Sequence, residues 1–132
     1  MSVMAVFCTA VGATVVFLTA VVVTGLRGVI TVHIPCVVAT LASLTLAIVY
    51  AIKLGEIYDL ATAGAMFTTH MVVAKLAAAS YALPVYTGIR TLRSRQHRRA
   101  HFWAAMLVLA LTLAASITGT LMLLWSEKRL PS

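Results

Sequence analysis

Residues 102–125 read FWAAMLVLALTLAASITGTLMLLW, an apolar run without a charged side chain. A helix that crosses the hydrocarbon core of a bilayer needs about 20 mostly apolar residues, and this run is long enough. Its apolar residues are continuous and do not alternate with polar ones, which favours a helix over a strand of a membrane barrel. We therefore predict that this segment is a membrane-spanning helix.

Three further segments have the same character, at residues 4–26, 33–53 and 62–86. The 132-residue chain is 62% hydrophobic and 10% charged, whereas soluble domains carry about 25% charged residues. No basic region precedes the first run, and this run is longer than the roughly 7–15 apolar residues of a signal peptide. The sequence therefore predicts one all-α domain, residues 1–132, folded as an integral membrane four-helix bundle.

The positive charge lies mainly at one end of the expected bundle. The net charge is +7, and the loop at 88–100 between the third and fourth spans holds five arginines, while Arg27 lies on the same side. The other side mixes its cations with Glu56, Asp59 and Glu127. By the positive-inside rule the arginine-rich side is cytoplasmic, which places both termini outside a plasma (inner) membrane. The arginines are expected to contact anionic lipid, and no nucleic-acid partner is expected.

The two halves of the sequence can be aligned. TGLR (24–27) matches TGIR (87–90), and LTLA recurs at 44–47 and 111–114. This pattern predicts a 2+2 internal repeat of helix pairs with the same topology, related by an axis along the membrane normal. Chance remains the alternative, because short Leu, Thr and Ala strings recur readily in apolar sequence.

In this alignment His33 and His101 occupy corresponding positions. Both would lie near the cytoplasmic face, on parallel helices that face each other across the axis. Two such histidines can supply both axial ligands of one haem iron. Arg27 and Arg90 would then lie near the haem propionates, although the positive-inside rule explains these arginines without any haem.

A four-helix unit with histidines on its second and fourth spans resembles small membrane b-type cytochromes, and one half of haem A synthase. The resemblance covers the whole chain and rests on His33 and His101. It implies a haem b, held by these two residues, that exchanges single electrons with a quinol or redox partner, as in a respiratory chain. No glutamate lies beside His33, and both histidines are expected on the cytoplasmic side instead of outside, so haem A synthesis is not expected.

Two ionisable residues, His70 and Lys75, lie within the third span. Such residues are costly at membrane depth and are candidates for function. Together with Glu56 and Asp59 of the outer loop they form a candidate quinone or proton site. The alternative is a structural polar contact with a neighbouring span or a partner protein.

A metal site that uses more than two protein ligands is a competing hypothesis. His97 and His101 are four residues apart, a spacing that lets two imidazoles reach one ion, with His33 and Cys36 as further ligands. Cys8 and Cys36 lie near opposite ends of their spans, so no disulfide is expected within the chain.

We therefore expect a membrane-embedded b-type haem protein or cytochrome subunit that transfers electrons. One alternative is a cofactor-free accessory subunit of a larger membrane complex, and another is a small transporter that uses Lys75 and His70. Other membrane subunits, or further copies of the chain, are expected partners. Whether the protein is an enzyme stays open.

Overall fold

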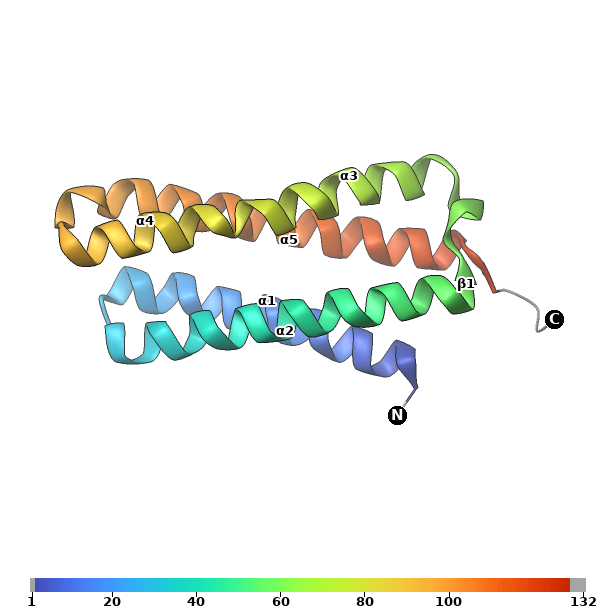
Figure 1. The fold of residues 1–132 in the computed structure, drawn as a ribbon, viewed down its shortest axis with the longest axis horizontal. Helices are drawn as coiled ribbons and strands as arrows, with labels where there is room; N and C mark the ends of the chain where they lie inside the picture. The colour runs from blue at the N-terminus through green and yellow to red at the C-terminus, as the bar shows by residue number, and fades with distance from the viewer. Residues whose placement is uncertain (1, 129–132) are drawn as a thin grey trace.

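The computed structural model describes residues 2–128, and it is built almost entirely from long helices that lie side by side (Figure 1). There are four long helical segments, and the third is divided into two helices, α3 and α4. The helices are α1 (Val3–Arg27), α2 (Ile30–Ile57), α3 (Ala65–Ser80), α4 (Ala82–Arg93) and α5 (Arg98–Trp125). By length and composition four segments could cross a membrane: Val3–Arg27, Ile30–Ile57, Ala65–Arg93 and Arg95–Trp125. The predicted all-α class and the four spanning-length helices are confirmed.

The short elements lie at the two ends of the helices. A 3-10 turn, η2 (Arg95–His97), joins α4 to α5, and another, η1 (Leu60–Ala63), precedes α3. The two-residue strands β1 (Tyr58–Asp59) and β2 (Glu127–Lys128) pair antiparallel. This pair and the N-terminus of α1 lie at one end, opposite the α1–α2 and α4–α5 connections (Figure 1). Arg27 and the basic loop therefore share one end of the molecule.

Gly28 makes the sharp connection between α1 and α2. Its φ of 72° lies in the left-handed region that favours glycine. The N–H of Gly28 donates to the carbonyl of Gly25, and the N–H of Val29 donates to that of Thr24. These bonds close the last turn of α1. The chain then reverses direction within two residues, and α2 runs back alongside α1.

The third long helix is interrupted at Tyr81, the residue between α3 and α4. Pro84 has no N–H to donate to the carbonyl of Ser80, and its ring crowds that carbonyl. The result is a local break in the helix one turn before Pro84. The helix starts at Ala65, and α4 continues from α3 along the same side of the bundle (Figure 1).

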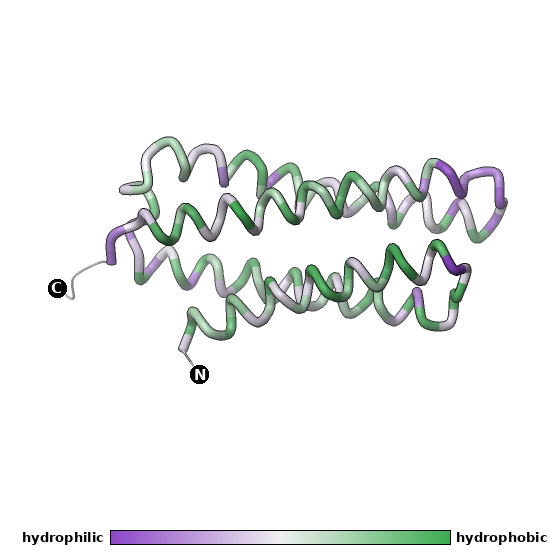
Figure 2. Tube along the Cα trace, turned by 180° about the vertical axis from the view of Figure 1, so that it is seen from behind, coloured by the Kyte–Doolittle hydropathy of each residue, from purple (hydrophilic) through white to green (hydrophobic). Residues whose placement is uncertain are grey.

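The outer surface of the bundle is apolar along most of its length. Leu18, Tyr81 and Val108 pack together in the centre, while large apolar side chains such as Val16, Ile52 and Leu92 are more than half exposed. The hydrophilic residues gather mainly at the two ends (Figure 2). Soluble monomers rarely expose so much continuous apolar surface, and this distribution suits a hydrocarbon environment.

Candidate functional site

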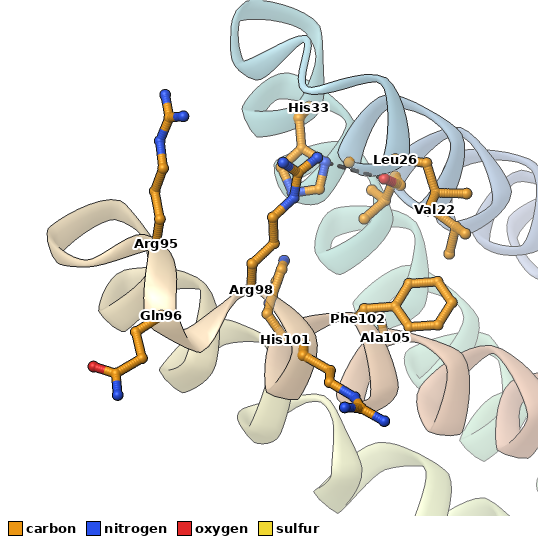
Figure 3. A pocket seen from close by; sticks show the side chains of 12 residues that line it. Val22, Leu26, His33, Arg95, Gln96, Arg98, His101, Phe102 and Ala105 are labelled. Carbon is orange, nitrogen blue, oxygen red and sulfur yellow. Dashed lines mark hydrogen bonds between the residues drawn. The ribbon is translucent and has the colours of Figure 1, made fainter.

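His33 and His101 lie opposite each other near the end of the bundle that carries the basic loop. Each is the fourth residue of its helix, because α2 begins at Ile30 and α5 at Arg98. The centroids of the two imidazole rings are 6.1 Å apart, and the ring planes are inclined at 77°. Figure 3 shows the two side chains reaching toward each other from different helices. The structure thus brings together the two histidines that the sequence singled out.

Hydrogen bonds fix the tautomer of His33. Its Nδ1 lies 3.0 Å from the carbonyl oxygen of Val21 and 3.2 Å from Oγ1 of Thr24. A carbonyl oxygen only accepts, so Nδ1 must carry the proton. The Thr24 hydroxyl donates to the carbonyl of Ala20 at 2.7 Å, which leaves its oxygen free to accept from the ring. In the neutral imidazole, Nε2 is therefore the nitrogen that keeps its lone pair.

His101 has the same kind of threonine contact. Its Nδ1 lies 3.2 Å from Oγ1 of Thr87, and the Thr87 hydroxyl donates to the carbonyl of Leu83 at 2.8 Å. Because the Thr87 hydroxyl proton is directed to Leu83, its oxygen accepts from the ring, and Nδ1 of the imidazole is the donor. The Nε2 lone pair of His101 is therefore also free.

A glycine follows each of these threonines and lets the ring approach the helix. A Cβ atom on Gly25 would lie 3.3 Å from Cε1 of His33, and one on Gly88 would lie 3.2 Å from Cε1 of His101. We call the combination of threonine hydrogen bond and glycine packing a Thr-Gly contact. It is formed by the first two residues of TGLR and TGIR, so each helix pair holds its histidine in the same way.

The spacing of the two rings suits a single metal between them. A metal–imidazole bond of about 2.0–2.1 Å, added to about 1.2 Å from nitrogen to ring centre, puts two rings on opposite sides of one metal about 6.5 Å apart. The observed 6.1 Å is close to this value. Histidines that ligate metals usually donate the other ring N–H to a carbonyl or similar acceptor, as both rings do here.

A cavity of about 490 Å³ opens beside the two rings (Figure 3). Its volume lies within the range of roughly 300–1,000 Å³ that is usual for ligand pockets. Apolar residues of α1 and α5, such as Val22 and Phe102, line one part, and Arg95, Arg98 and Arg99 line the other. A smaller cavity of about 50 Å³ also reaches both histidines from the bundle interior.

The two arginines that the sequence placed near the cofactor lie elsewhere. Arg27 and Arg90 are exposed, and neither is among the described residues that line the cavity. Arg90 donates to the hydroxyl of Tyr86 at 3.3 Å, and its guanidinium lies over the ring of the same tyrosine. The cations at the cavity are instead those that η2 and the start of α5 provide.

His70 has a Thr-Gly contact of its own, at the other end of α5. Its Nδ1 lies 3.1 Å from Oγ1 of Thr118, and a Cβ atom on Gly119 would come within 2.9 Å of its Cε1. The Thr118 hydroxyl donates to the carbonyl of Ala114. No second imidazole is described beside His70, so this contact orients a single ring.

The other members of the predicted quinone or proton site are dispersed. Lys75 is exposed and Glu56 is exposed, while the Asp59 carboxylate accepts from the N–H of Ala61 and caps η1. His70 is directed toward α5, and Lys75, five residues later, lies on a different face of α3. The side chains of the four predicted site residues therefore do not lie together.

The structure does not support the hypothesis of a metal site with more than two protein ligands. Within residues 2–128 no three or more His, Cys, Asp or Glu side chains lie together as metal ligands. Cys8 and Cys36 are both free thiols, as expected. Among the described residues, His33 and His101 have no third such side chain grouped with them as a metal ligand.

Comparison of the chain with models of protein families, with curated proteins and with solved structures gave no match.

Proposed function

We propose that the protein is a membrane-embedded b-type haem protein that transfers electrons, with His33 and His101 as the axial ligands. The observation that carries the proposal is the pair of imidazole rings with centroids 6.1 Å apart. Both rings have Nδ1 engaged in hydrogen bonds, which leaves both Nε2 atoms free to bind. The proposal includes descent of the two helix pairs from one duplicated pair, supported by their identical Thr-Gly contacts.

The membrane location rests on the surface of the bundle. Trp103 and Trp125 are both 61% exposed on α5, and their 22-residue separation corresponds to about 33 Å of helix. Tryptophan is enriched at both membrane interfaces, and the hydrocarbon core is about 30 Å thick. The arginine-rich end would face the cytoplasm by the positive-inside rule, with both termini outside the plasma membrane.

The residues around the histidines suit a flat, mostly apolar cofactor with acidic groups. Haem bound here would supply a one-electron couple at an iron whose two axial positions are filled by imidazole. The apolar side chains of Val21, Phe102 and Ala105 line the cavity beside the rings. Arg95, Arg98 and Arg99 can pair with the two propionates at the aqueous end. If His33 and His101 both held the iron, no ligand position would be left for a substrate, and electron transfer would be favoured over catalysis at the iron.

The position of the two histidines near one end implies an electron partner on that side. The ends of α2 and α5 that hold His33 and His101 lie beside the basic loop, opposite the β1–β2 pair. A quinol or a redox protein that approaches the arginine-rich end would reach the site over the shortest path. Transfer across the whole membrane would require a second redox centre in a partner subunit.

A visible spectrum tests the proposal. The chain is produced with haem available, purified in detergent, and measured in its oxidised and reduced forms. The parent is expected to show sharp b-type bands, and His33→Ala and His101→Ala are each expected to lose them. His70→Ala is the matched control, because it removes a histidine that has its own Thr-Gly contact, and it should keep the bands. A folded, colourless parent would contradict the proposal and favour the cofactor-free accessory subunit.

A further inference from the structure

Lys75 lies at the middle of the membrane thickness proposed above. The contact of His70 with Thr118 and Gly119 sets the register between α3 and the antiparallel α5. Five residues further along α3, Lys75 is therefore level with about residues 113–114 of α5. The midpoint between Trp103 and Trp125 is residue 114, so the backbone of Lys75 lies at the level of the bilayer centre.

The Lys75 side chain faces away from the bundle. Lys75 is exposed, and Val72 and Leu76 beside it on α3 are 54% and 56% exposed. An extended lysine side chain reaches about 6 Å, which does not span the roughly 15 Å from the bilayer centre to its edge. A lysine at this depth is costly, and such residues usually pair with a group of opposite charge.

The described part of the chain cannot supply that opposite charge to Lys75. The three acidic residues of the sequence, Glu56, Asp59 and Glu127, all lie at the end with the β1–β2 pair. Glu127 is 13 residues from the level of residue 114, or about 20 Å along the bundle. A second copy of the chain, in either orientation, carries its side-chain carboxylates equally far from the bilayer centre.

We propose that the face of α3 formed by Val72, Lys75 and Leu76 docks a membrane-spanning helix of a different subunit, which carries an Asp or Glu at mid-membrane. The carboxylate would neutralise Lys75 in a medium of low dielectric, where such a pair is strong and specific for depth. The apolar neighbours on both sides would pack against the partner helix. The inference rests on the membrane location proposed above and is independent of haem.

Designed helices test this docking face directly. The full chain is reconstituted into phosphatidylcholine vesicles with synthetic Leu/Ala spanning peptides that carry Glu, Gln or Leu at the centre and a fluorescent acceptor. Energy transfer from Trp103 and Trp125 reports association. We expect the Glu peptide to associate at least tenfold more strongly than the Leu peptide. Lys75→Leu should abolish this difference, Lys75→Arg should keep it, and Lys53→Leu, which removes a lysine near the end of α2, should leave it unchanged.

Equal association of the Glu and Leu peptides with the parent would overturn the proposal, as would a Glu preference that persists in Lys75→Leu. Cross-linking of the parent without any peptide tests whether a second copy of the chain occupies this face instead. Self-association that is lost in Lys75→Leu would identify a second copy as the partner and would also overturn it. Because the assay does not involve haem, its outcome is separate from that of the visible spectrum.

Discussion

At the scale of single residues, the Thr-Gly contact is the recurring device of this protein. It holds His33, His101 and His70 through a threonine hydroxyl beside Nδ1 and a glycine against Cε1. The threonine donates to its own helix and accepts from the ring, so one tautomer is selected in each case. Of these three described histidines, only His33 and His101 have rings next to each other, with centroids 6.1 Å apart, whereas the His70 ring is oriented alone.

Replacing the hydroxyl that orients His101 should weaken haem binding. In Thr87→Val the partner of Nδ1 at 3.2 Å is lost while the size of the side chain is retained. Outer-shell changes of this kind typically cost 10–100-fold in affinity, and we expect at least a tenfold lower haem affinity by titration of the haem-free protein. Thr87→Ser keeps the hydroxyl and should restore most of the affinity. Equal affinity in Thr87→Val and the parent would contradict this role.

A methyl group on Gly88 should displace the His101 ring. The added Cβ would lie 3.2 Å from Cε1, tighter than ordinary packing, and overpacking of this kind costs about 1–3 kcal/mol. We expect Gly88→Ala to lower the thermal unfolding temperature in detergent and to shift the haem midpoint potential. Gly12→Ala is the matched control, because a Cβ there meets nothing within 4 Å and gains helix propensity. An unchanged potential in Gly88→Ala would contradict the packing described here.

The sequence predicted the residues of the site better than their contacts. His33 and His101 stand out because each follows a basic loop and begins an apolar run. The strings TGLR and TGIR were visible as a repeat, but their contact with the histidines depends on how far each helix pair turns back on itself. The connection between the helices is two residues long in the first pair and contains η2 in the second. The number of residues from threonine to histidine therefore differs between the pairs, and this difference hides the common geometry in the sequence.

At the scale of elements, the interrupted third helix is tied to α5 by one buried hydrogen bond. The Tyr81 hydroxyl lies 3.0 Å from Oγ1 of Thr112, and both residues are buried. Tyr81 stands at the break between α3 and α4, where the helical hydrogen-bond ladder is weakened by Pro84. The bond therefore fixes α4, which carries the Thr-Gly contact for His101.

Removing this hydroxyl should destabilise the bundle modestly. Tyr81→Phe deletes one buried hydrogen bond, worth about 0.5–1.5 kcal/mol, and should lower the free energy of unfolding by about that amount in a detergent titration. Tyr86→Phe is the matched control, since its hydroxyl is on the exposed face of α4 and contacts only Arg90. Equal stabilities of the two variants would show that the Tyr81 bond does not hold the break.

Element boundaries were predictable where a residue type dictates them. Pro84 indicated the break in the third span, although the helical interruption lies at Tyr81 because the proline acts on the preceding turn. The directions of the arginines were not predictable, because they depend on helical phase and on the 3-10 turn of η2. All of these arginines are exposed, but Arg95 lines the cavity while Arg27 and Arg90 do not.

At the scale of the whole molecule, charge distribution is expected to set the orientation in the membrane. The two connections that carry Arg27 and the basic loop lie at one end, and the described acidic residues lie at the other (Figure 1). The positive-inside rule counts Lys and Arg in such short loops. The apolar length and the helix count were fully predictable from composition, since a continuous apolar run has few alternative structures.

Neutralising the basic loop should therefore scramble the orientation of the chain. With Arg93, Arg95, Arg98 and Arg99 all changed to Asn, we expect a mixture of orientations in place of one. A C-terminal phosphatase, active only outside, and a C-terminal fluorescent protein, fluorescent only inside, measure the two populations. Lys53→Asn at the opposite end is the control and should leave the orientation uniform. A quadruple variant with an unchanged orientation would contradict this account.

The central claim is that His33 and His101 share one haem iron, and the electron paramagnetic resonance spectrum of the oxidised protein tests it most directly. Ring planes inclined at 77° predict the highly anisotropic low-spin ferric signal that is typical of nearly perpendicular axial imidazoles. The same signal should disappear from His33→Ala and from His101→Ala and remain in His70→Ala. Absence of a low-spin haem signal in the parent, or its persistence in either of the first two variants, would contradict the claim.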